Sequence, residues 1–181
     1  MGRMSAINGT IDSVSMNSLC RPPIFVTVTA KRAKRITGLR IIETALAAKK
    51  LAIHIDSQGG IRDEWARTNG NDIVKVIISK WFELGGLVAT PVASKISPPH
   101  LKRTLADACF QDAGDKLIVR LAIAVLEKRK VGIFFVGTTD SDFWDPRSIK
   151  MKGKQTAVVA SALHANGIRV LLFSDFMEAI S

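Results

Sequence analysis

Short apolar runs alternate with segments of helical periodicity along most of the chain. Runs rich in apolar and β-branched residues predict strands at 22–30, 51–57, 131–137 and 168–174. Apolar positions spaced three or four apart predict helices over 37–50, 71–86, 97–110, 114–130 and 153–167, and a last turn of helix begins at Ser174 or Asp175. A short apolar piece, 87–90, stands between two of these helices. This alternation is typical of an α/β fold with a mostly parallel central sheet and helices on both faces.

The domain organisation follows from length and composition. A chain of 181 residues, 47% of them hydrophobic, can bury one substantial core. Residues 1–22 are rich in Ser, Asn and Gly and are predicted to be a flexible segment, which leaves 23–181 as a single domain. No apolar run approaches the roughly 20 residues that span a bilayer. Cys20 and Cys109 are isolated thiols, which favours a reducing cytoplasm.

The charge balance indicates a polyanionic partner. Lys and Arg number 26 against 16 acids, a formal net charge of +10. Residues 107–145 reverse this excess, with seven acids and five bases. A basic protein with one acidic stretch suits nucleic acid together with an embedded cation site, although a basic surface can also serve solubility alone.

Several common catalytic motifs are missing from the sequence. There is no dinucleotide-binding or P-loop glycine pattern and no G-x-S-x-G elbow. His54, His100 and His164 lie far apart and do not form a metal-ligand pair. Carboxylates are therefore the main candidates for chemistry.

Acidic residues stand at two predicted strand ends and one helix start. Asp56 ends a strand, Asp140 and Asp142 follow another, and Asp115 opens the helix whose buried stripe continues through Ile118, Val119 and Ala122. Glu64 follows Asp56 after eight residues. Each acid alone has an ordinary alternative as a helix cap, turn residue or solvated charge, and Asp112 competes with Asp115. Together they suit Mg²⁺ or Mn²⁺, which prefer oxygen ligands.

Three motifs resemble those of the PIN-domain nucleases. These are "DSQGGIRDEW", "GDKLIVRLA" and "VGTTDSDF", and the ending "GIRVLLFSDFMEAI" is similar to the family's closing strand and helix. The resemblance covers roughly 50–181. It implies a PIN-like fold and a Mg²⁺- or Mn²⁺-dependent endoribonuclease. In that family's pattern the catalytic acids would be Asp56, Glu64, Asp115 and Asp140, and the metal ligands Asp56, Asp115, Asp140 and Asp142. Asp145, before Pro146, is read as a turn residue, and Thr138 and Thr139 could hydrogen-bond the carboxylates or the scissile phosphate.

Two basic tracts could hold the phosphates that flank the cleaved bond. The tract "AKRAKRITGLR" contributes Lys31, Arg32, Lys34 and Arg35, and "PRSIKMKGK" contributes Arg147, Lys150, Lys152 and Lys154. The alternative for each tract is a solvated basic surface. Trp65 and Trp144 could stack on an unpaired base, with core packing as the alternative.

The expected partner is therefore RNA, with DNA as a second possibility. The resemblance also allows a protein inhibitor or antitoxin and a homodimer, and no membrane partner is expected. Two other functions stay open: a nucleic-acid-binding module without catalysis, and a transferase that uses Asp-x-Asp to hold a metal-bound nucleotide.

Overall fold

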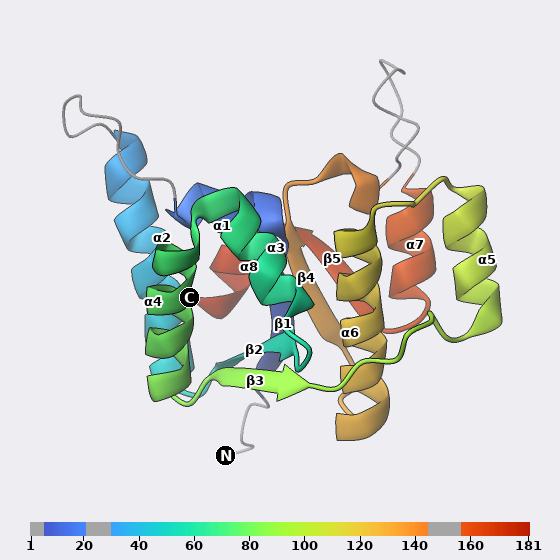
Figure 1. Ribbon diagram of the computed structural model, residues 1–181, viewed down its shortest axis with the longest axis horizontal. Helices are drawn as coiled ribbons and strands as arrows, with labels where there is room; N and C mark the ends of the chain where they lie inside the picture. Colours follow the sequence, from blue (N-terminus) through green and yellow to red (C-terminus); the bar gives the residue numbers. More distant parts are fainter. Residues whose placement is uncertain (1–5, 21–29, 145–156) are drawn as a thin grey trace.

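A computed structural model describes residues 6–20, 30–144 and 157–181, and they form a five-stranded parallel sheet between layers of helices (Figure 1). The strands are β1 (Ile7–Ile11), β2 (Leu51–Asp56), β3 (Leu87–Thr90), β4 (Phe134–Thr138) and β5 (Ile168–Leu172), in the order β3-β2-β1-β4-β5. Every neighbouring pair is parallel. The predicted α/β class with a parallel sheet is confirmed.

The prediction of a flexible N-terminal segment over 1–22 is wrong for the described residues. Ile7–Ile11 is the central strand of the sheet, and α1 (Ser13–Cys20) follows it directly. The strand was missed because its sequence, INGTI, has three polar or small residues in the middle. Gly9 is required there, since a Cβ would lie 2.7 Å from the carbonyl oxygen of Phe135 on β4. The predicted strand at 22–30 lies outside the described residues except for Ala30, which begins α2.

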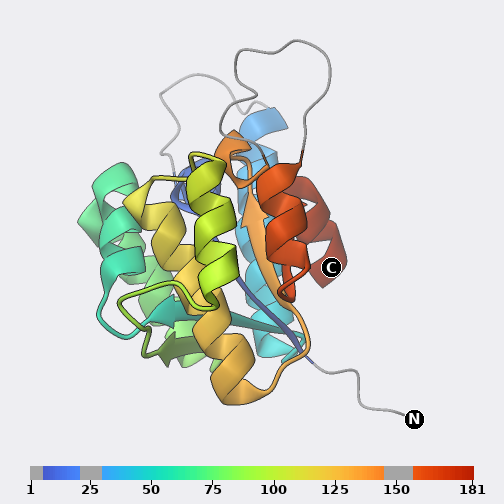
Figure 2. The same ribbon diagram turned by 90° about the vertical axis from the view of Figure 1, so that its right-hand side faces the viewer.

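The remaining helices cover the sheet on both sides. They are α2 (Ala30–Ala47), α3 (Gly60–Asn69), α4 (Asn71–Glu83), α5 (Pro99–Asp107), α6 (Ala113–Arg129), α7 (Val158–His164) and α8 (Phe173–Ile180), with a 3-10 turn η1 (Ser141–Phe143) after β4. Helix α8 contacts β4, β5 and α2, whereas α6 crosses β2, β3, β4 and β5. Figure 2 shows α5, α6 and α7 together on one side of the molecule. No helix in the described part of the chain is both long and apolar enough to cross a bilayer.

Burial in the core tests two predictions from the sequence, the inward face of α6 and the environment of Trp65. The predicted stripe of α6 is buried at Ile118, Val119 and Ala122. Trp65 is also buried and packs edge-on against Trp81, so it is a core residue and does not present its ring to a ligand. Its indole N–H donates to the carbonyl oxygen of Ile11 (3.2 Å), which ties α3 to the end of β1.

Candidate active site at the carboxyl edge of the sheet

The winding of the sheet reverses between β1 and β4. From β1 the chain proceeds through β2 to β3 on one side, and β4 and β5 lie on the other side. In open parallel sheets, ligands bind at the carboxyl ends of the two strands where the winding reverses. Asp12 directly follows β1, and Asp140 follows β4 after one intervening residue. The fold therefore brings two carboxylates to the position where a site is expected.

Asp12 is buried just beyond the carboxyl end of β1. Its side chain is 1% exposed, and Oδ1 accepts a hydrogen bond from the backbone N–H of Ser15 (2.7 Å), which caps α1. The hydroxyl of Thr138 on β4 donates to Oδ2. Burial raises the pKa of Asp12, the hydrogen bonds of Ser15 and Thr138 lower it, and the charge of Asp140 raises it further.

The turn after β4 is organised by the same threonine. The Thr138 hydroxyl accepts a hydrogen bond from the backbone N–H of Asp140 (2.9 Å) while it donates to Asp12. Asp140 Oδ1 in turn accepts from the N–H of Asp142 (2.9 Å) and caps η1. Thr138 was predicted to hydrogen-bond carboxylates, and its carboxylate partner is Asp12.

Helix α6 supplies a third carboxylate. Asp112 is its N-cap and accepts from the N–H groups of Gly114 (2.7 Å) and Asp115 (3.1 Å). Asp115 is therefore not the capping residue, and its side chain, in the first turn, is buried. Burial, followed by the charges of Asp140, Asp112, Asp12 and Asp142, raises the pKa of Asp115 to about 8.

Asp140 is the common neighbour of the other acids. Its charge raises the pKa of Asp12, Asp115 and Asp142. For Asp142 burial is the larger cause, and Asp140 and Asp112 add to it. We call Asp12, Asp112, Asp115, Asp140 and Asp142 the acid cluster. Mutual repulsion of this kind is typical of functional sites, where a bound cation relieves it.

Glu64 lies at the edge of the acid cluster. It lines a small recess together with Asp112, Gly114 and Asp115. Gly114 permits this approach, because a Cβ there would lie 3.4 Å from the Glu64 side chain. Glu64 also pairs with Arg67 (2.5 Å), one turn further along α3. Its charge is not among those that raise the pKa of Asp115.

Asp56 has a different environment from the one that the sequence suggests. Its Oδ2 accepts from the backbone N–H of Gly60 (2.8 Å) and its Oδ1 from that of Ile61 (2.7 Å). Both oxygens thus cap α3, and the charge of Asp56 is not among those that raise the pKa of Asp115. The role expected of a first strand-end acid is open instead to Asp12, which the sequence analysis missed. The sequence does contain a signal for Asp12. This acid directly follows Thr10 and Ile11, and the serines after it begin a helix.

The side chains predicted to bind phosphate lie outside the described part of the structure. Arg147, Lys150, Lys152 and Lys154, together with Asp145, lie outside the described residues. Lys31, Arg32, Lys34 and Arg35 lie in the first turns of α2, where only the backbone is described. Trp144 is partly buried and packs against the core. His54 is buried between Asn8 and Thr90, and burial followed by the charge of Arg129 lowers its pKa to about 4, so it is neutral near pH 7.

The donor set of the acid cluster suits a hard divalent cation. Asp12 after β1 and Asp115 of α6 are buried, and Asp140 after β4 is partly buried, so their carboxylates could supply oxygen ligands. Burial and then the neighbouring acids raise the pKa of Asp115. Within the described residues, no three Asp, Glu, His or Cys side chains are grouped closely enough to hold an ion as they stand. The fit therefore rests on the chemistry of the donors and on their electrostatic coupling.

No protein-family model matches the chain, and no curated protein or solved structure is significantly similar to it.

Proposed function

We propose that this protein is a Mg²⁺- or Mn²⁺-dependent nuclease that hydrolyses phosphodiester bonds of RNA at the acid cluster. The observation that supports the proposal is the electrostatic coupling of Asp115 on α6 to Asp12 and Asp140, which follow β1 and β4 at the winding reversal of the sheet. The PIN-like motifs and the net charge of +10 favour a nucleic-acid substrate.

The residues of the cluster would divide the work. Asp12, Asp115 and Asp140 would hold the divalent cation, and Asp142 and Glu64 lie where they could orient water or complete the ligand set. A bound cation supplies Lewis acidity and activates water for attack on phosphorus. Thr138 acts as a positioning residue, because its hydroxyl joins Asp12 to the turn that carries Asp140.

Asp115 links ion binding to proton release. With a pKa of about 8, its carboxyl group is largely protonated at pH 7 when no cation is present. A ligand carboxylate must lose that proton, so ion uptake should release protons below pH 8.

The test is cleavage of labelled single-stranded RNA with Mn²⁺, with Mg²⁺ and with EDTA. We expect cleavage with either ion, none with EDTA, and none in Asp140→Asn. Asp72→Asn is the matched control, because Asp72 is an exposed acid on α4 outside the cluster.

A second readout separates ion binding from turnover. Mn²⁺ at 100 times its dissociation constant should stabilise the wild-type protein by about 2.7 kcal/mol and raise its melting temperature, with a much smaller shift in Asp140→Asn. Ion-dependent stabilisation without cleavage of RNA or DNA would contradict the nuclease proposal and favour a binding module. Cleavage that persists in EDTA would contradict metal dependence.

A further inference from the structure

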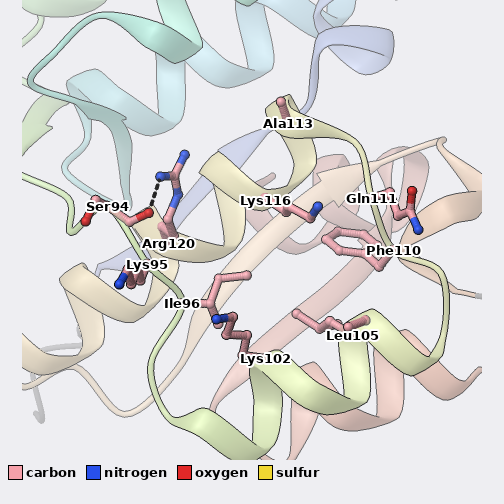
Figure 3. Close-up of a pocket in the computed structure, with 11 residues that line it drawn as sticks. Ser94, Lys95, Ile96, Lys102, Leu105, Phe110, Gln111, Ala113, Lys116 and Arg120 are labelled. Atoms are coloured by element: carbon pink, nitrogen blue, oxygen red, sulfur yellow. Dashed lines mark hydrogen bonds between the residues drawn. The ribbon is translucent and has the colours of Figure 1, made fainter.

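A cavity of about 410 Å³ opens between α5 and α6 on the flank of the acid cluster (Figure 3). The first turn of α6 separates the two. Ala113 and Lys116 line the cavity, whereas Gly114 and Asp115 line the recess beside Glu64. The cavity therefore begins within one helical turn of the candidate ligands.

The walls of this cavity combine an apolar floor with a cationic rim. Ile96, Leu105 and Phe110 form apolar surface. Lys102 of α5 ends beside Ile96, and Lys116 of α6 extends toward Gln111 (Figure 3). Lys95 and Arg120 add two further cations, and none of the residues that line the cavity is acidic. A ligand that fits both features has a flat, weakly polar part and a negative charge.

Arg120 is fixed in the wall of this cavity. Its Nη1 donates to the carbonyl oxygen of Ser94 (2.9 Å), which holds the guanidinium group in place. The guanidinium group is therefore a positioned positive charge in the wall.

The floor of the cavity is joined to the acidic turn. Phe110 packs edge-on against Phe143, with ring centroids 5.4 Å apart, and Phe143 directly follows Asp142. Both rings are buried, so the cavity and the turn that carries Asp140 are parts of one packed unit.

We propose that this cavity binds a single unpaired nucleotide of the RNA strand, next to the phosphate that is cleaved. The base of this nucleotide lies against Ile96 and Leu105. Lys102 and Lys116 contact the phosphates on either side of the nucleotide. The volume is in the range of nucleotide-sized ligand pockets. The assignment deepens the proposed nuclease function and rests on it. An acidic peptide could meet the same cations but offers no flat group for the apolar floor.

The experiment measures binding in EDTA, in the Asp140→Asn background, so that neither cleavage nor ion binding contributes. The probes are a labelled single-stranded hexaribonucleotide and an abasic hexamer with the same number of phosphates. Two changes alter the cavity: Lys102→Gln with Lys116→Gln removes charge, and Ala106→Trp fills the space from an exposed position on α5. The matched control is Arg103→Gln with Lys80→Gln, which removes two exposed charges outside the cavity.

We expect the double lysine change and Ala106→Trp each to weaken hexaribonucleotide binding about tenfold, with the control near the parent affinity. The double change should also reduce the salt dependence by roughly 1.4 in the log–log slope, for two lost phosphate contacts on a single strand. The abasic hexamer should bind more weakly than the hexaribonucleotide and be insensitive to Ala106→Trp.

Two results would overturn the assignment. The first is that both cavity variants bind the hexaribonucleotide as the control does. The second is that a Glu-rich hexapeptide binds more tightly than the hexaribonucleotide and loses affinity in Ala106→Trp, which would assign the cavity to a protein partner. Failure of the nuclease proposal gives a different result from failure of the cavity proposal. A protein that never cleaves RNA can still bind the hexaribonucleotide in a way that depends on the cavity residues.

Discussion

Two buried aspartates at the ends of neighbouring strands differ in their electrostatic surroundings. Asp56 uses both carboxylate oxygens to cap α3 through Gly60 and Ile61. Asp12 also caps a helix, but its charge acts on Asp115 and it is bonded to the threonine that positions Asp140. The difference lies in what surrounds each carboxylate, since both residues are buried aspartates at strand ends.

Substitution of these two aspartates separates the roles. We expect Asp12→Asn to reduce Mn²⁺-dependent RNA cleavage at least about 100-fold, because a ligand of the cation is lost. Asp56→Asn should cleave within about threefold of the wild type, because the charge of Asp56 does not act on Asp115. It should be less stable than the wild type, because asparagine can accept only one of the two hydrogen bonds from Gly60 and Ile61. Cleavage rates at saturating Mn²⁺ give the comparison, and circular dichroism checks that both variants fold. A larger loss in Asp56→Asn than in Asp12→Asn would restore Asp56 as the ligand.

The raised pKa of Asp115 predicts how stability depends on pH without divalent cations. The folded state keeps a proton up to about pH 8, whereas the unfolded chain releases it near pH 4. Stability from this group is fully present below pH 4 and is lost as the pH rises through 8. Asp115→Asn cannot ionise, so it should equal the wild type near pH 4 and exceed it at pH 9.

Each unit by which the pKa is raised costs about 1.4 kcal/mol, so we expect Asp115→Asn to gain at least that amount at pH 9. Urea denaturation in EDTA at pH 5, 7 and 9 measures the difference. An equal pH dependence in the two proteins would show that Asp115 ionises normally.

At the scale of elements, two glycines set the distance between the sheet and α8. A Cβ on Gly137 of β4 would lie 2.8 Å from Cγ of Phe176, and one on Gly9 of β1 would lie 3.2 Å from the same ring. The helix therefore packs directly over β1, which Asp12 follows, and β4, which ends at Thr138. Close packing here supports the alignment of the site.

We expect Gly137→Ala to destabilise the fold by about 1–3 kcal/mol, because the buried Phe176 ring cannot move aside freely. Gly132→Ala is the control, since a Cβ there meets no atom within 4 Å. Thermal unfolding of both variants tests this. A Gly137→Ala protein as stable as Gly132→Ala would mean that α8 can shift without cost.

At the scale of the whole molecule, the chain combines an excess of basic residues with one acid cluster. The formal net charge is +10, yet five aspartates gather where β1, β4 and α6 meet. A cationic surface raises the local concentration of a polyanion such as RNA. A divalent cation bound in the acid cluster would remove the repulsion between the phosphates of the RNA and the carboxylates of the cluster.

The tract after the acidic turn should contribute to this attraction. Replacing Lys150, Lys152 and Lys154 together with Gln should weaken RNA binding and lower the log–log salt slope by roughly 2, for three lost contacts to a single strand. Titration in EDTA at several salt concentrations measures it. An unchanged slope would mean that this tract serves only as a soluble surface.

Local patterns in the sequence were sufficient for the fold class and for part of the candidate site. Helical periodicity located α4, α5 and α6 within a few residues, and the buried stripe of α6 showed that Asp115 lies beside the core. Apolar runs located β2, β4 and β5, and therefore the strand end before Asp140. These features depend on residues that are close in the chain, so they can be recognised without tertiary structure.

Only the tertiary structure decided which strands are neighbours and which aspartates meet. The central strand β1 was not recognised because INGTI lacks an apolar pattern, although its place in the sheet is set by pairing with β2 and β4. Asp12 and Asp140 are 128 positions apart and become neighbours through that pairing. Whether an aspartate that caps a helix also joins a charged cluster depends on the charges that the fold places around it, and these come from distant parts of the chain.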